Sequence, residues 1–231
     1  MRRTIAGVDG CAGGWLAVVQ SDRGIEAQVA RNLETLIHAM PGVLIGIDIP
    51  IGLPDRGPRA CDLHARKLLG QPRGSSVFPA PIRACLKDGG YSELSSLHKE
   101  VDGRGLTRQA FHLLPKIREV DDLLRRPALA ERIREVHPEV SFALWNGGQP
   151  MRFKKKKPDG RRERESLIDR EWPGERERLA RQLRGCGCAA DDLNDAFAAL
   201  WSSRRIMAGE AKVFPSEIQR DSTGLPMRIE A

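Results

Sequence analysis

The sequence predicts an α/β fold whose sheet has both antiparallel and parallel strands. Residues 4–19 read as a strand, a glycine-rich turn and a second strand, which together predict a hairpin. Residues 43–50 form an apolar run, as is typical of a parallel strand that is covered on both faces. Between these stretches, apolar residues recur at helical spacing after a candidate N-cap, Asn32, and Pro41-Gly42 ends that helix.

Local patterns predict the next elements along the chain. Residues 24–30 alternate apolar and polar side chains, as a half-exposed third strand does. Residues 51–130 are rich in proline and glycine, so we expect a loop-rich insertion after the fourth strand. Within it, the sequence predicts helices over 59–69 and over 109–125, the second broken near Pro115.

The carboxyl-terminal part of the chain predicts one more strand and several helices. In order, we expect a strand over 131–139, a short helix over 140–144, an exposed basic loop over 154–160, a helix over 161–184, a helix over 191–201 that Gly209 closes, and an edge strand or surface extension over 225–229. The helix over 191–201 has the clearest pattern of the chain.

Length and composition predict one globular domain over 1–231 with the insertion at about 51–130. The 231 residues are 40% hydrophobic and 30% charged, which is enough for an adequate core. No apolar run approaches the ~20 residues that cross a bilayer, so we expect no membrane contact. Five cysteines, an odd number, favour reduced thiols and a cytoplasmic protein, and their spacing matches no standard zinc module.

The positive charge of the chain is concentrated in one region. The formal net charge is +7, and residues 152–184 contain thirteen Lys or Arg against seven Asp or Glu. A basic face attracts polyanions, so nucleic acid, DNA or RNA, is the expected partner. The alternative is a highly charged surface segment that is only solvated, which would have the same composition.

Two aspartates stand where predicted strands end. Asp9 follows the first strand and Asp48 lies near the end of the fourth. If these strands are neighbours, both carboxylates lie at the same end of the sheet. A buried carboxylate is costly without a cationic partner, which makes Asp9 a candidate for chemistry. Asp9-Gly10 is equally typical of a hairpin turn.

The last helix carries further acidic residues at helical spacing. Asp191 and Asp192 stand in its first turn, where the helix dipole alone favours carboxylates. Asp195 lies deeper among apolar residues and shares a face with either of them. We therefore expect Asp195 to be the functional acid of this helix, with Asp192 second.

Clustered carboxylates need compensation, because like charges raise each other's pKa. Mg²⁺ or Mn²⁺ held by Asp9, Asp48, Asp192 and Asp195 would supply it. Two such ions ~3.5–4 Å apart activate water and stabilise the leaving oxygen in phosphodiester cleavage. The sequence thus predicts a metal-dependent nuclease with an acidic site on a basic surface.

Two further residues are candidates for the same site. His137 stands at the predicted end of the fifth strand and would carry protons near the metal, or it has only a structural role before Pro138. Glu139 is a possible fourth catalytic carboxylate. Residues 75–81 predict an apolar-polar loop that covers the site.

Short motifs throughout the chain resemble a known family. They are Gly7-Val8-Asp9-Gly10, residues 45–54, residues 75–81, residues 115–121, residues 135–139 and residues 191–196. Together they look like the domain-of-unknown-function family 429, described as predicted ribonuclease H-like nucleases. The resemblance implies a ribonuclease H-like fold: a five-stranded mixed sheet with an antiparallel second strand and helices on both faces. It also implies acids at Asp9, at Asp48 and at Asp192 or Asp195.

Two other functions compete with the nuclease. A nucleotide-dependent phosphotransferase of the sugar-kinase and actin type shares the fold and an Asp-Gly turn, but Cys11-Ala12-Gly13 replaces its Thr- or Ser-containing phosphate loop. A non-catalytic nucleic-acid-binding protein would use the lysines at 154–157 and would not need Asp9.

Overall fold

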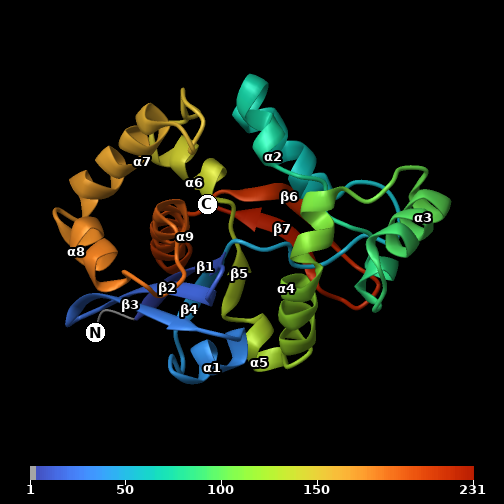
Figure 1. Cartoon of the computed structure of the whole chain (residues 1–231), viewed down its shortest axis with the longest axis horizontal. Coiled ribbons are helices and arrows are strands. Elements are labelled where there is room, and N and C mark those ends of the chain that lie inside the picture. The colour runs from blue at the N-terminus through green and yellow to red at the C-terminus, as the bar shows by residue number, and fades with distance from the viewer. Residues whose placement is uncertain (1–3) are drawn as a thin grey trace.

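A five-stranded mixed sheet with helices on both faces forms the centre of the molecule (Figure 1). The computed structural model describes residues 4–231, so residues 1–3 of the predicted domain lie outside the described part. The strands are β1 Ile5–Cys11, β2 Gly14–Ser21, β3 Gly24–Ala30, β4 Leu44–Ile47 and β5 Ile133–Glu135. Their order is β3-β2-β1-β4-β5, with β2 antiparallel to both neighbours and β1, β4 and β5 parallel.

The predictions of an α/β fold, the hairpin and the central parallel strand are confirmed. Most residues of β1 and β2 are buried, whereas the edge strand β3 alternates at its start, as its sequence predicted. Asn32 also caps its helix as expected, accepting a hydrogen bond from the backbone of Thr35 at 2.8 Å.

Helices cover the two faces of the sheet (Figure 1). Their bounds are α1 Leu33–His38, α4 Arg108–Leu124 and α5 Pro127–Ala130 on one face, and α6 Pro138–Trp145, α7 Pro158–Glu171, α8 Glu175–Gln182 and α9 Ala190–Ala208 on the other. Each face has its own apolar core. No helix within residues 4–231 has both the length and the apolar character needed to span a membrane.

The helix α9 lies unusually close to the middle of the sheet. A Cβ atom on Gly7 would fall 2.0 Å from the backbone nitrogen of Leu200, so only glycine permits this contact. On β4, the backbone of Gly46 donates to Ser203 Oγ at 2.8 Å, and that hydroxyl donates to the Ala6 carbonyl oxygen at 2.7 Å. Two glycines and one serine therefore fix α9 over β1 and β4.

Most of the segment between β4 and β5 lies to one side of the five-stranded sheet (Figure 1). It contains α2 Ala60–Arg73, the short 3₁₀ helices η1 Gly74–Ser76 and η2 Arg83–Leu86, α3 Tyr91–Asp102, and the helices α4 and α5. At the carboxyl end, β6 Val213–Arg220 and β7 Pro226–Glu230 pair as a separate antiparallel sheet. The predicted edge strand over 225–229 is thus β7, while β6 was not predicted.

Two predictions were wrong about where a helix is interrupted. The helix α4 is unbroken at Pro115, because its apolar face, including Leu114 and Ile117, stays buried on both sides of the proline. The predicted helix over 161–184 is two helices, α7 and α8. They are separated at Pro173-Gly174, where Gly174 has φ of 74° and cannot continue a helix.

Two predicted boundaries were also wrong. The strand expected over 131–139 covers only β5, since Pro138 is the first residue of α6 and His137 is its N-cap. The basic loop expected over 154–160 ends earlier, because Pro158 begins α7. In both places proline starts a helix instead of only ending the preceding element.

Replacing Gly7 with alanine tests the contact between α9 and β1. We expect the free energy of unfolding to fall by about 3 kcal/mol or more, because the new methyl group overlaps backbone atoms that cannot move independently. Gly90→Ala is the matched control, since a Cβ there meets nothing within 4 Å, and it should change stability by less than ~1 kcal/mol. Urea unfolding measures the stability of both variants. If Gly7→Ala unfolded at the same midpoint as the native protein, the close contact between α9 and β1 would be contradicted.

Candidate functional site

The register of two parallel strands brings Asp9 and Asp48 together. Val8 pairs with Ile47, so the two aspartates that follow are neighbours at the carboxyl ends of β1 and β4. The backbone of Asp48 donates to the Val8 carbonyl oxygen at 2.9 Å, which extends the pairing. Side chains alternate along a strand, and Gly7 and Gly46 face α9, so both aspartates face α9 as well.

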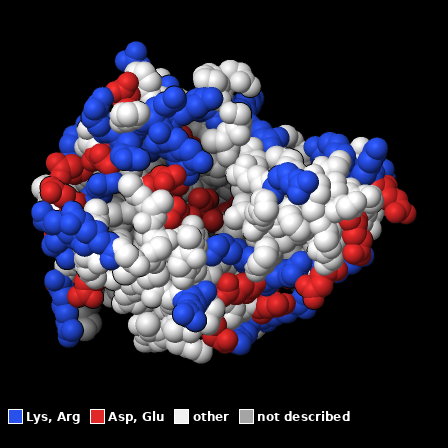
Figure 2. Space-filling view, viewed as in Figure 1, with Lys and Arg blue, Asp and Glu red and all other residues white. Residues whose placement is uncertain are grey.

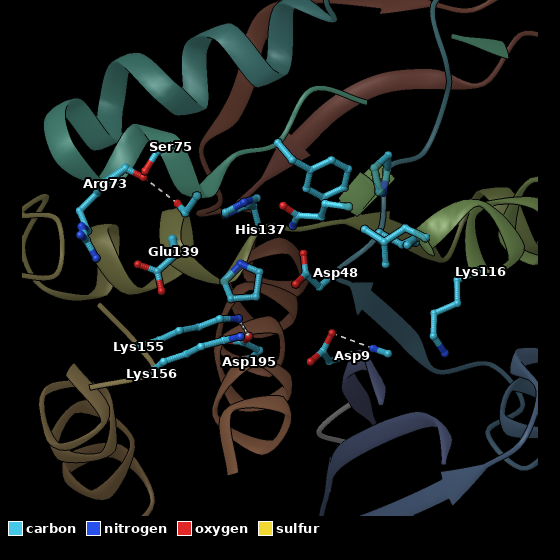
Figure 3. A pocket seen from close by; sticks show the side chains of 18 of the residues that line it. Asp9, Asp48, Arg73, Ser75, Lys116, His137, Glu139, Lys155, Lys156 and Asp195 are labelled. Atoms are coloured by element: carbon cyan, nitrogen blue, oxygen red, sulfur yellow. Dashed lines mark hydrogen bonds and ion pairs between the residues drawn. The ribbon is translucent and has the colours of Figure 1, made fainter. Parts of the chain in front are cut away.

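The first turns of α9 place a third carboxylate at this edge. Asp195 is only 2% exposed, within a helix whose residues 193–203 are all buried. Asp9, Asp48 and Asp195 line one cavity of about 410 Å³ (Figure 3). The structure therefore brings together three acids that are far apart in the sequence.

The walls of this cavity come from several elements. Further lining residues include Arg73 at the end of α2, Ser75, Ser76 and Phe78 after it, Gln109, Leu113 and Lys116 of α4, His137, Pro138 and Glu139 at the start of α6, and Lys154, Lys155 and Lys156. Figure 2 shows acidic side chains on the floor of a hollow bordered on one side by many Lys and Arg. The predicted covering loop over 75–81 contributes Ser75, Ser76 and Phe78 to the wall.

Lys155 reaches into the cavity and pairs with Asp195. Its Nζ donates to Asp195 Oδ2 at 2.5 Å, whereas Asp195 Oδ1 is buried and has no hydrogen-bond partner among the described residues. Burial raises the pKa of Asp195 to about 6, although the ammonium opposes it. Burial acts to lower the pKa of Lys155, but Asp195 and the other carboxylates hold it above its usual range. Lys155 is therefore a fixed positive charge.

Asp9 and Asp48 have no such partner. Within residues 4–231 neither forms a salt bridge, and Asp9 Oδ1 accepts only a local hydrogen bond from the backbone of Gly10 at 2.7 Å. Burial, then the charge of Asp48 and Asp195, raises the pKa of Asp9. Burial and Asp195 likewise raise the pKa of Asp48 to about 8. If all three carboxylates were ionised, the single ammonium of Lys155 would leave an excess of two negative charges, and the raised pKa values show that protonation relieves this excess.

Glu139 and His137 also line the cavity, Glu139 as an ion-paired carboxylate and His137 as a neutral imidazole. Both oxygens of Glu139 accept from the buried guanidinium of Arg164 at 2.7 Å, so its charge is already balanced. Burial lowers the pKa of His137, which leaves its imidazole neutral at pH 7. Its Nδ1 is buried and has no hydrogen-bond partner in the described part of the chain.

Asp192 lies outside the cavity lining. Its Oδ2 accepts a hydrogen bond from the backbone of Ala189 at 2.8 Å, as a residue that stabilises a helix start does. Burial nevertheless raises the pKa of Asp192. On α9, Asp195 is therefore the acid that faces Asp9 and Asp48.

The donor set fits a hard divalent cation in its chemistry, though not as a preassembled cage. Among residues 4–231, no three His, Cys, Asp or Glu side chains are grouped closely enough to hold a metal ion. The cavity does offer the oxygens of three neighbouring carboxyl groups, among them the unpartnered Asp195 Oδ1. A cation there would bind Asp195 alongside Lys155, or it would displace the Lys155 ammonium from Asp195.

Sequence reasoning did not identify Lys155 and Arg164 as site residues. Lys155 belongs to a run of four lysines, and nothing in that run marks which one turns inward. Arg164 stands in a helix with many other charged residues. Only the fold shows that it is 1% exposed and bound to Glu139.

The fold and the site define an α/β protein with buried carboxylates beneath a basic rim. The chain belongs to the family described as Protein of unknown function (DUF429), which it matches over residues 7–220. The matched range includes all three acids. Neither the curated proteins nor the solved structures contain a match to this chain.

Asp48→Asn should stabilise the protein at high pH. A carboxyl whose pKa is raised by folding stabilises the folded state below its unfolded pKa, and this contribution is lost as the pH rises through its folded pKa of about 8. Asparagine carries no such charge. We expect a gain on the order of 2 kcal/mol at pH 9 that shrinks towards pH 4.

Urea unfolding in the presence of a chelator, at several pH values, measures this gain. The exposed Asp122→Asn is the matched control and should shift stability by less than ~0.5 kcal/mol. If the change in stability caused by Asp48→Asn were the same at every pH, folding would not raise the pKa of Asp48.

Proposed function

We propose that this protein is a metal-dependent nuclease with a ribonuclease H-like fold that hydrolyses phosphodiester bonds of nucleic acid. One observation carries the proposal: Asp9, Asp48 and Asp195 meet in a single cavity where burial and mutual repulsion raise the pKa values of Asp9 and Asp48, below a rim of lysines and arginines. Acids that destabilise the folded protein in this way are characteristic of catalytic sites.

The topology supports the ribonuclease H-like part of the proposal. That superfamily has a five-stranded mixed sheet with an antiparallel second strand, and its acids lie on the first strand, the fourth strand and the last helix. This chain has the order β3-β2-β1-β4-β5 with β2 antiparallel, and its three acids lie on β1, just after β4 and on α9.

Asp9, Asp48 and Asp195 would hold Mg²⁺ or Mn²⁺. The ion would activate water and stabilise the leaving oxygen of the phosphodiester. The chain itself supplies the surrounding functions. Lys116 and Arg73 line the cavity and attract the phosphate, and the neutral imidazole of His137 is in the state that accepts a proton.

The structure favours the nuclease over the phosphotransferase. A phosphate loop needs open backbone N–H groups after the first strand. Here the turn is covered, because the backbone of Gly13 donates to the Gly187 carbonyl oxygen at 3.2 Å and a Cβ on Gly13 would lie 2.4 Å from the Cys186 carbonyl oxygen. The Gly13 N–H is therefore not free to bind a phosphate.

Asp9→Asn separates a nuclease from a non-catalytic nucleic-acid-binding protein. We expect the native protein to cleave nucleic acid with Mn²⁺ or Mg²⁺. Asp9→Asn should lower the rate on the order of 10²-fold or more, because an amide neither balances nor binds the cation as a carboxylate does. Binding should change less than about 3-fold, since the basic rim is intact.

Single-stranded, duplex, hybrid and junction substrates should be assayed for cleavage and for binding. Asp122→Asn is the control and should cleave at the native rate. A folded protein that binds these substrates and cleaves none of them would support the non-catalytic alternative instead.

Calorimetry with Mn²⁺ tests the metal independently of cleavage. We expect the native protein to bind Mn²⁺ and the variants Asp48→Asn and Asp195→Asn to bind it at least about 10-fold more weakly. Asp122→Asn should bind as the native protein does. If the native protein takes up no Mn²⁺, protons and Lys155 alone balance the carboxylates, and the metal-dependent mechanism fails.

A further inference from the structure

An aromatic side chain stands exposed in the basic loop, here defined as residues 152–157. Phe153 is 43% exposed, and it is the only aromatic among the large exposed hydrophobic side chains of the described residues. Its neighbours Arg152, Lys154 and Lys156 are exposed as well. A phenyl ring among cations is the composition of a surface that binds single-stranded nucleic acid.

The backbone of the basic loop is held in place from below. Glu163 accepts hydrogen bonds from the backbone of Arg152 at 2.8 Å and of Phe153 at 3.2 Å. The buried Arg164 donates to the Phe153 carbonyl oxygen at 3.3 Å and also binds Glu139 of the cavity. Phe153 is therefore presented to solvent by an anchored backbone.

The basic loop leads directly into the acidic cavity. Lys154, Lys155 and Lys156 line the cavity, and Lys155 is bonded to Asp195 (Figure 3). Arg73 and Phe78 line the same cavity. A strand lying on Phe153 and the loop would thus lead into a cavity that offers further cations and another aromatic ring.

We propose that the basic loop binds unpaired nucleotides and delivers a single strand to the acids. Phe153 stacks on a base, and Lys154 and Lys156 contact phosphates. Stacking requires a free base face, which a nucleotide inside a duplex does not offer. The inference rests on the proposed function, because it names the substrate class of that same site.

Fluorescence anisotropy in a chelator measures binding without cleavage. The probes are a labelled single-stranded oligonucleotide of mixed sequence, as DNA and as RNA, and the duplex of each. We expect the single strand to bind at least about 10-fold more tightly than the duplex. Phe153→Ala should weaken single-strand binding roughly 5- to 100-fold, which is the range measured when a stacking aromatic is removed.

Two variants separate stacking from folding or general apolar contact. Phe153→Trp keeps an aromatic face and should retain native binding. Leu63→Ala removes another exposed apolar side chain, 46% exposed and outside the cavity lining, and should leave binding unchanged. Circular dichroism verifies that each variant is folded.

The results distinguish this proposal from the proposed function. Equal binding of duplex and single strand, with no effect of Phe153→Ala, overturns the single-strand proposal while cleavage by the native protein still stands. Binding of neither probe by the folded protein overturns both and leaves Phe153 as a contact for another class of partner. A preference for the single strand that Phe153→Ala abolishes supports the proposal even if no cleavage occurs.

Discussion

The close contact of α9 with β1 and β4 determines the rest of the site. A helix at ordinary distance from the sheet would hold its first turns away from the strand ends. Here Gly7 and Gly46 remove the side chains that would keep it away, and Ser203 bonds to the backbone of both strands. Asp195 is consequently buried near Asp9 and Asp48 instead of lying in solvent.

The fold compensates some of these charges and leaves others unbalanced. Glu139 has Arg164, and Asp195 has Lys155, each at hydrogen-bond distance. Asp9 and Asp48 form no ion pair within residues 4–231, and burial raises their pKa values although the charge of Lys155 opposes it. Burying acids in this way lowers stability. Under the proposed function a divalent cation would offset this cost, so the site would trade stability for chemistry.

The sequence predicts the acids better than their partners. Asp9 and Asp48 are recognisable because strand ends are marked by apolar runs, and Asp195 because it lies deep in a clear helical pattern. Lys155 could not be recognised, since choosing one lysine of four requires the position of α9. Pairing across the fold also explains why β6 was missed, because its exposed residues have no strand pattern without β7.

For the proposed nuclease, the separation between an acidic floor and a basic rim would resolve an electrostatic conflict in binding nucleic acid. The carboxylates alone would repel phosphates, whereas the lysines alone would bind a strand without acting on it. In that proposal the lysine run would serve both needs. Lys155 turns inward and pairs with Asp195, which would reduce the negative charge that a phosphate meets, while Lys154 and Lys156 remain exposed. Glu163 and Arg164 hold the backbone of this loop. The exposed lysines of the loop are therefore held in a fixed position relative to the acids below them.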